Sequence, residues 1–502
     1  MSYEPAYPNP SALVESLRSV GYSLATAVAD VLDNSITAGA NSIWINFHWD
    51  GQDSHVSILD DGRGMTESVL REAMRPGTTS PTEIREKTDL GRFGLGLKTA
   101  SFSQCRQLTV WSKANGGSFC GRRWDLDYVV EKNEWLLQRD LDEPELDSFT
   151  ALGQLGSGTL VIWEKADRIV DDSMPVNEVL QKFHQQINDV RSYLGMIFHR
   201  HLTGKASGRR SQPLRIFING NTIDGWDPFS AGQSASPEIS PIEEIEYKGQ
   251  MVRLQGFVMP HKDRLSESDH SFTGGPRGWI AQQGFYIYRN DRMLLAGDWL
   301  RLGRGGKIWV KEEQYKLARL SIDIGNGMDL DWSLDVKKST ARPPLALRER
   351  LTGIAEAQRK RAKSVFLFRG VHGPKPLIAK AIEKPWVVQS RAGKIVYKVN
   401  REHPLVKGVL QRLGPLASEA ETLLRLIEET VPVQQIWIDT AESESDHAIP
   451  YQGLSETQVL ADMKKTYEFL RLGALDHETA VSYLMAVEPF NRYPNLTNKL
   501  GP

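Results

Sequence analysis

The stretch AVADVLDNSITAGANSI, residues 27–43, decides how the N-terminal part of this chain is interpreted. A helix over this stretch has an apolar side that holds Leu24, Val28, Val31, Leu32 and Ser35. Another side holds Asp30, Asp33, Asn34 and Thr37, which follow one another at positions i, i+3, i+4 and i+7. Such a polar stripe indicates either a solvated helix face or a face turned toward a ligand.

The composition bounds the class of protein. The chain has 502 residues, of which 40% are hydrophobic and 25% charged, as in soluble globular proteins of two or three domains. No apolar run reaches the roughly 18 residues of a membrane span, and MSYEPAYPNP lacks a signal-peptide pattern, so we expect a cytoplasmic protein without membrane contact. Cys105 and Cys120 form no metal-binding pair or disulfide framework. The net charge of −2 restricts any nucleic-acid contact to a local basic patch.

Periodicity and turn residues divide the chain into three expected domains, 1–203, 204–345 and 346–502. The first holds expected helices over 11–20, 23–37, 68–75 and 176–201, and strands over 42–49, 55–61, 107–113 and 158–165. The second has strand-and-turn character, interrupted at 261–278 by an expected mobile loop. The third is expected to be mainly helical, with a hairpin over 386–399 and a strand over 434–439.

A second motif is VSILDDGRGM, residues 56–65, in which a strand ends at Asp60 and is followed by Gly62 and Gly64. The pattern is typical of a tight turn, where glycine supplies a positive φ. It also suits a ligand site, because the aspartate can accept a hydrogen bond from an exocyclic amine while the glycines let a flat ring approach the backbone. The pattern alone leaves both interpretations open.

A third motif is GRFGLGLKTAS, residues 91–101, a glycine-rich loop that opens a helix. Backbone N–H groups and the helix dipole bind phosphate at such a point. The loop is not a Walker A motif, because Leu97 separates Gly96 from Lys98. Its G-x-x-G-x-G spacing also differs from that of a Rossmann fold.

In this order, the three motifs resemble those of the GHKL ATPases, the superfamily of gyrase B, MutL, the MORC proteins and the histidine kinases. The resemblance covers about residues 11–165 and implies an α+β chain that begins with a GHKL (Bergerat) ATP-binding α/β sandwich, which binds ATP and Mg²⁺. It implies that Asp30 is the general base and Asn34 the magnesium ligand. It assigns adenine to Asp60, Gly62, Gly64 and Met65, supported by Thr159 of GSGTLVIW. It assigns lid and phosphate contacts to Gly91, Gly94, Leu95, Gly96, Leu97 and Lys98.

One residue departs from the family pattern, because Asp30 stands where the family normally has glutamate. Its side chain is one methylene shorter, and misplacing a catalytic group by about 1 Å can cost on the order of a hundredfold in rate. A closer helix, an intervening water or slow hydrolysis would each be consistent with this change. Asp33 is expected to support the helix or the site.

The second domain resembles the β-rich α+β transducer domain of MutL and MORC proteins, through LRIFINGNTIDGWDPF, GFYIYRNDRML and WSLDVKKSTARPP. A transducer lysine reaches the terminal phosphate, which makes Lys337 and Lys338 the candidates, unless both are solvent lysines at a strand end. Basic residues also cluster in RLGRGGKIWVKEEQYKLAR, residues 301–319, and QRKRAK, residues 358–363. These clusters either contact DNA or form ordinary solvated faces.

The leading hypothesis is an ATP-operated clamp of the MutL/MORC-like branch, in which ATP pairs two chains into a homodimer and hydrolysis releases them. A nucleic-acid-directed setting, such as antiviral defence or restriction, is expected by analogy alone. A second hypothesis is an ATP-sensing scaffold that hydrolyses slowly or not at all and recruits a separate effector protein. A third is a chaperone-like ATPase that acts on protein clients.

Overall fold

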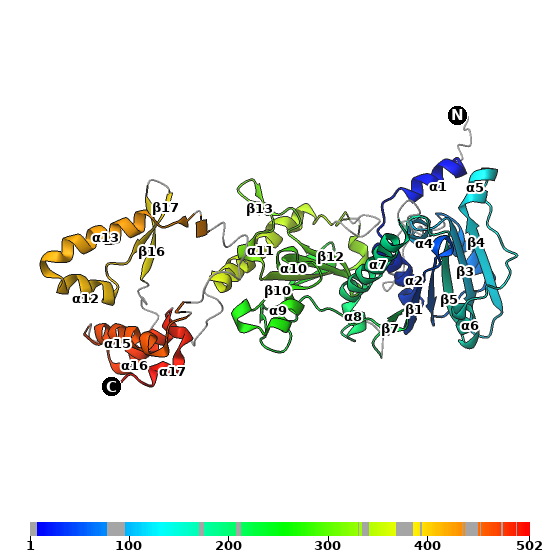
Figure 1. The fold of residues 1–502 in the computed structure, drawn as a ribbon. Coiled ribbons are helices and arrows are strands. Elements are labelled where there is room, and N and C mark those ends of the chain that lie inside the picture. The colour runs from blue at the N-terminus through cyan, green and yellow to red at the C-terminus, as the bar shows by residue number, and fades with distance from the viewer. Residues whose placement is uncertain are drawn as a thin grey trace, which may run out of the picture. The chain divides into compact units, whose positions relative to one another are not determined.

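The structure is a computed structural model. It describes residues 8–77, 96–169, 175–206, 212–329, 331–333, 341–367, 385–391, 394–433, 435–436, 450–451, 453–472, 475–487 and 489–501. The chain divides into two compact units, residues 1–367 and 368–502. The first unit contains two large mixed sheets with helices packed against them, which confirms the predicted α+β class (Figure 1).

The first sheet has seven strands in the order β4-β3-β5-β2-β1-β6-β7. These are β1 (Ser42–His48), β2 (His55–Asp60), β3 (Gln107–Lys113), β4 (Phe119–Asp125), β5 (Gly158–Glu164), β6 (Arg215–Ile218) and β7 (Asn221–Thr222). The predicted hairpin is present as β1 and β2, which pair from Ile43 opposite Asp60 to His48 opposite His55. Neighbouring strands are antiparallel except for β1 and β6, which are parallel.

Helices cover both faces of this sheet. The larger core lies beneath α1 (Pro10–Arg18), α2 (Leu24–Thr37), α4 (Gly96–Phe102) and α7 (Val176–Ile197). On the opposite face, α6 (Asp147–Gln154) packs against Leu59, Trp111 and Leu160. Three shorter helices, α3 (Glu67–Met74), α5 (Leu126–Lys132) and α8 (His199–Leu202), complete this part of the unit.

Helix α2 is the predicted helix of the opening stretch. It begins after Ser23, whose hydroxyl accepts a hydrogen bond from the Thr26 N–H while the Thr26 hydroxyl accepts one from the Ser23 N–H. This reciprocal capping box fixes the start of the helix. Almost every side chain of α2 is buried, Asp30 and Asp33 included, whereas Asn34 is exposed. The alternative of a solvated face is therefore wrong for both acids.

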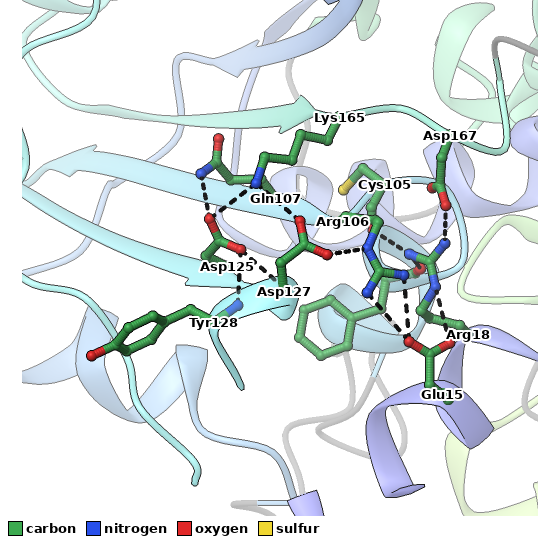
Figure 2. Close-up of polar contacts among 11 residues, drawn as sticks. Glu15, Arg18, Cys105, Arg106, Gln107, Asp125, Asp127, Tyr128, Lys165 and Asp167 are labelled. Atoms are coloured by element: carbon green, nitrogen blue, oxygen red, sulfur yellow. Dashed lines mark hydrogen bonds and ion pairs between the residues drawn. The ribbon is translucent and has the colours of Figure 1, made fainter. Parts of the chain in front are cut away.

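Helix α1 is attached to the end of α4 by a buried arginine, as Figure 2 shows. The Arg18 guanidinium donates to the carbonyl oxygens of Phe102 (2.9 Å) and Cys105 (2.8 Å) and to the Asp167 carboxylate (2.6 Å). A cation at the C-terminus of a helix meets carbonyl groups that have no partner within that helix. Arg106 extends the network by contacting Glu15 and Asp127. These contacts fix the C-terminal end of α4, the helix that follows the glycine-rich segment of the sequence.

The second sheet contains β8 (Glu238–Ile239), β9 (Glu243–Tyr247), β10 (Gln250–Val258), β11 (Gly284–Arg289), β12 (Arg292–Asp298) and β15 (Ala318–Ile324). Its main path is β12-β11-β15-β10-β8, with β9 paired to β10. The long helix α11 (Leu345–Leu367) packs on this sheet, and a small pair, β13 (Gly303–Arg304) and β14 (Lys307–Ile308), lies apart from it. The predicted loop at 261–278 is wrong, because it contains α9 (Glu267–Gly274) and begins α10 (Gly278–Ala281).

The second sheet has a core of its own but also contributes three residues to the core of the first sheet. Tyr286, Tyr288 and Met293 of β11 and β12 belong to the apolar cluster of the first sheet. The Tyr288 hydroxyl is 2.9 Å from Nε2 of His199 on α8, and the neighbouring Arg200 pairs with Asp323 of β15. The predicted boundaries at 203 and 345 stay predictions, although β6 extends the first sheet beyond residue 203.

The second unit has a core of its own, formed by α15 (Glu456–Leu472), α16 (His477–Ala486) and α17 (Pro494–Thr497). The predicted hairpin is present as β16 (Trp386–Arg391) and β17 (Lys394–Val399). It is followed by α12 (Pro404–Arg412) and α13 (Ala417–Glu429). The expected strand at 434–439 is wrong where it is described, because Gln435 and Ile436 are helical.

Among the described residues, no helix is both long enough and apolar enough to span a bilayer.

Helix α3 offers a test of the fold at two adjacent positions. Leu70 is fully buried, whereas Val69 is 52% exposed. We predict that Leu70→Ala lowers the free energy of unfolding by about 2–5 kcal/mol, because it removes buried methyl groups and leaves a cavity. Val69→Ala is the matched control and should change stability by less than about 0.5 kcal/mol. Urea denaturation of both variants measures this, and equal losses would contradict the assigned buried face.

Candidate functional site

The first part of the candidate site surrounds Asp60, at the end of β2. The side chain is buried, and its carboxylate accepts hydrogen bonds from the Ser35 hydroxyl on α2 (2.7 Å) and the Gly62 N–H (2.9 Å). Thr159 lies directly opposite Asp60 on the neighbouring strand β5. The Thr159 hydroxyl is 2.9 Å from that of Ser112 on β3, which also accepts from the Met65 N–H (2.9 Å). The Asp60 carboxylate thus joins β2 to α2, and the contact between Thr159 and Ser112 joins β5 to β3 beside it.

Both glycines after Asp60 lie where a side chain would collide with its neighbours. Gly64 has a φ of +64°, and a Cβ there would lie 1.9 Å from the Lys113 carbonyl oxygen. A Cβ on Gly62 would lie 2.9 Å from both the Asp60 Oδ1 and the Ala38 Cβ. The tight-turn interpretation therefore accounts for Gly64, whereas Gly62 is needed because it lies close to both the Asp60 carboxylate and Ala38.

The second part is the polar stripe of α2. The Tyr22 hydroxyl donates a 2.8 Å hydrogen bond to Oδ2 of Asp30. A Cβ on Gly96, the first residue of α4, would lie 3.9 Å from the same oxygen. Asp33 pairs with Arg292 of the second sheet, with Nε 3.0 Å from Oδ1. Asn34 is exposed, so its amide remains accessible one turn from Asp30.

The remaining predicted site residues belong to the glycine-rich loop and to the lysine pair of the second sheet's domain, and only some of them are described by the structure. The Lys98 ammonium donates to the Ala73 carbonyl oxygen at the end of α3 (2.8 Å), and burial lowers the pKa of this lysine to about 8. Leu97 packs against the first core. The expected site residues Gly91, Gly94, Leu95, Lys337 and Lys338 lie outside the described residues. All these assignments stay predictions.

The structure revises the predicted basic clusters. Lys316, Arg319 and Arg359 are buried rather than exposed. The Arg319 guanidinium donates to the Thr273 carbonyl oxygen (2.7 Å), and that of Arg359 lies 3.7 Å from the centre of the Tyr315 ring. Several exposed members have acidic partners, since Arg304 and Lys360 share Glu356 and Arg361 pairs with Glu238. Buried or paired cations contribute little to binding a phosphate backbone.

Sequence reasoning missed four residues of the site. The periodicity puts Ser35 on the apolar side of α2, and a hydroxyl among apolar side chains is the signal that could have identified it. Ser112 and Tyr22 carried no signal of their own. Arg292 lies 259 positions from Asp33, so no local pattern connects them.

Comparison with known proteins agrees with this geometry. Residues 22–159 match the family model described as "Histidine kinase-, DNA gyrase B-, and HSP90-like ATPase". This segment contains Tyr22, Asp30, Asn34, Asp60 and Thr159. The N-terminal part of the chain is therefore a domain of the GHKL ATPase class.

Within this class, the similarity is to the MutL and MORC proteins. The DNA mismatch repair protein MutL of Halobacterium salinarum is 32% identical over 106 residues, which are 21% of this chain and 16% of the relative. MutL of Rhodospirillum rubrum is 33% identical over 103 residues, 20% of this chain and 16% of the relative. ATPase morc-1 of Caenorhabditis elegans is 29% identical over 91 residues, 18% of this chain and 10% of the relative. The matched segment spans about a sixth or less of each relative.

The environment of Asp60 predicts a pH-dependent stability. Burial raises the pKa of its carboxyl to about 6, although hydrogen bonds from Ser35 and Gly62 act in the opposite direction. Between about pH 4 and pH 6, the Asp60 carboxyl is therefore still protonated in the folded protein but ionised in the unfolded chain. The free energy of unfolding of the wild type consequently falls as the pH rises through this interval.

Asn cannot titrate, so the stability of Asp60→Asn relative to the wild type should increase by roughly 2–3 kcal/mol over that interval. Urea unfolding without nucleotide, at several pH values across the interval, measures the difference. A difference that does not change with pH would contradict the inferred burial of the charge.

Proposed function

We propose that this chain is a magnesium-dependent ATPase whose nucleotide lies along α2, with adenine at Asp60 and the phosphates near Asp30 and Asn34. The observation that carries the proposal is the hydrogen bond between Ser35 and Asp60. It joins the end of β2 to the helix that bears the other two residues. The similarity of residues 22–159 to ATPase domains supports the same assignment.

The residues fit such a nucleotide. A buried carboxylate beside a glycine can accept a hydrogen bond from an adenine amine without steric hindrance from a side chain. Within the described part of the chain, no three His, Cys, Asp or Glu side chains are grouped to hold a metal ion. Mg²⁺ favours oxygen ligands and retains water, so the Asn34 amide oxygen together with phosphate oxygens would hold it. Its charge would neutralise charge that develops on the phosphates.

The chemical role of Asp30 follows from its position. A carboxylate one helical turn from Asn34 can orient a water molecule and accept its proton. The Tyr22 hydroxyl holds one oxygen of this carboxylate, and Gly96 at the start of α4 lies beside the same oxygen. Its reach is shorter than that of glutamate, so we infer slow hydrolysis.

A second candidate function is the ATP-sensing scaffold that recruits a separate effector protein. The observation in its favour is that the Asp30 carboxylate is buried and hydrogen-bonded to Tyr22, which restrains its movement toward a water molecule. Single-turnover hydrolysis separates the two functions, because a scaffold would bind ATP without releasing phosphate.

We further propose that the protein acts on or with nucleic acid. The support for this role is the name of the MutL relatives, which are DNA mismatch repair proteins. The exposed Arg301 and Lys307 are the members of the first basic cluster that best suit a phosphate backbone. DNA binding that weakens with added salt would favour this role over action on protein clients.

Substitutions at Asp30 and Asn34 separate catalysis from binding. We predict that Asp30→Asn lowers the single-turnover rate by about a hundredfold or more, because a general base acts on water rather than on bound nucleotide. Its ATP affinity should stay near that of the wild type in calorimetry. Asn34→Ala should weaken ATP binding in Mg²⁺ but not in EDTA, and because Asn34 is exposed its fold should be intact.

Asp30→Glu is the matched variant, since it keeps the charge and restores the family's usual length. A wild-type rate in Asp30→Asn would exclude Asp30 as the base. Thermal melting of each variant checks that the fold is retained.

The clamp hypothesis predicts nucleotide-dependent assembly. A non-hydrolysable ATP analogue should give more dimer than ADP does, because ATP shifts the equilibrium only by preferring the closed state. The double variant Lys337→Ala/Lys338→Ala should lose this difference. Analytical ultracentrifugation across micromolar concentrations measures both, and an unchanged mass in the two nucleotide states would favour the scaffold instead.

A further inference from the structure

Arg292 begins β12 of the second sheet, yet its side chain lies against α2 of the first domain. Nε is 3.0 Å from Oδ1 and 3.1 Å from Oδ2 of Asp33. Nη1 donates to the Met293 carbonyl oxygen (2.9 Å), and Nη2 is 3.7 Å from Oδ1 of Asp30. One guanidinium thus contacts both acids of the stripe.

These charges are removed from solvent. The side chains of Arg292 and Asp33 are each 1% exposed, and that of Asp30 is 5% exposed. Burial lowers the pKa of the Arg292 guanidinium, but the neighbouring carboxylates of Asp33 and Asp30 more than offset this and raise it overall. Arg292 therefore remains charged, and because water does not screen the contacts, they are strong and sensitive to position.

The Asp30 carboxylate is approached from two sides. The Tyr22 hydroxyl donates to Oδ2, while Arg292 lies nearest to Oδ1. Burial and the charge of Asp30 raise the pKa of Tyr22, so this hydroxyl keeps its proton and acts as a donor. The carboxylate is thus held between one residue of its own domain and one residue of the second domain.

The position of Arg292 depends in turn on how the β11–β12 hairpin packs against α8. Next to it in the hairpin, Asp291 pairs with Arg200 of α8, and the Arg200 guanidinium stacks 3.6 Å from the centre of the Tyr288 ring. Any movement of β11 and β12 relative to α8 would carry Arg292 away from the two acids.

We propose that Arg292 is a positioning residue for hydrolysis, which holds Asp30 in its working orientation directly and through Asp33, so that the chemical step requires the second domain to be seated. This inference rests on the proposed role of Asp30 as the general base. Arg292 acts through Asp30, and we assign it no contact with nucleotide.

The test compares Arg292→Gln with Arg292→Lys in the full chain. Arg292→Gln should lower kcat by about tenfold or more, because small displacements of a catalytic group are costly, and should leave KM and ATP affinity nearly unchanged. Arg292→Lys keeps the charge without the planar fork and should recover part of kcat. Arg253→Gln is the matched control, because Arg253 pairs with Glu244 in the same sheet but is exposed. Its kcat should equal that of the wild type.

A second pair of measurements separates positioning from structural support. In the Asp30→Asn background, Arg292→Gln should change the residual single-turnover rate by less than about twofold, because the group it positions is already gone. Tyr22→Phe removes one hydroxyl from the other side of the same carboxylate. Tyr22→Phe should also lower kcat without lowering ATP affinity. This variant tests the positioning of Asp30 if Arg292→Gln does not fold.

Three results would overturn the proposal: wild-type kcat in Arg292→Gln, a loss of ATP affinity as large as the loss of kcat, or the same loss of rate with and without Asp30. A wild-type rate in Asp30→Asn alone is a different failure, because it removes the proposed general base itself. An inactive Asp30→Asn with a fully active Arg292→Gln would leave the proposed function intact and refute only the positioning role.

Discussion

Helix α2 lies in the interior of the first unit, and this burial constrains every polar side chain on it. A buried charge or hydroxyl is costly unless it has a partner, so the acids of α2 cannot simply face inward. Ser35 reaches Asp60, Asp30 accepts from Tyr22, and Asp33 pairs with Arg292. Three different parts of the chain are thereby fixed to one helix, and Asn34 remains exposed between them.

The patterns within about ten residues were predictable from sequence. Periodicity and turn residues predict α2, the first hairpin and the C-terminal hairpin. The resemblance to the GHKL ATPases, not a local pattern, is what links Asp60 with Thr159, and the two residues lie opposite each other on neighbouring strands. Contacts over long separations were not predictable, because no local signal links Asp33 to Arg292 or Ser112 to Thr159. The segment 261–278 was misjudged because its Ser, Gly and Pro residues suggested a loop, whereas the Ser266 hydroxyl caps α9.

Several arginines around the second sheet are buried or paired within the protein. Arg319 donates to carbonyl groups and Arg359 lies among aromatic rings. The acids of β15 and of the β11–β12 hairpin pair with Arg200 of α8. A sequence rich in arginine therefore does not imply a basic surface. These residues connect the second sheet to the helices and loops packed around it.

The parallel pairing of β1 with β6 bears on how the protein is synthesised. β6 lies beyond the long helix α7 in sequence, yet it and β7 complete the sheet that carries Asp60 and Thr159. A nascent chain that has not yet extended past β6 leaves β1 as an open edge, and unpaired edges invite association with other strands. Strand β1 therefore gains its second neighbour only after residue 218 has been synthesised, and the core of this sheet is complete only once Tyr286, Tyr288 and Met293 of β11 and β12 have followed.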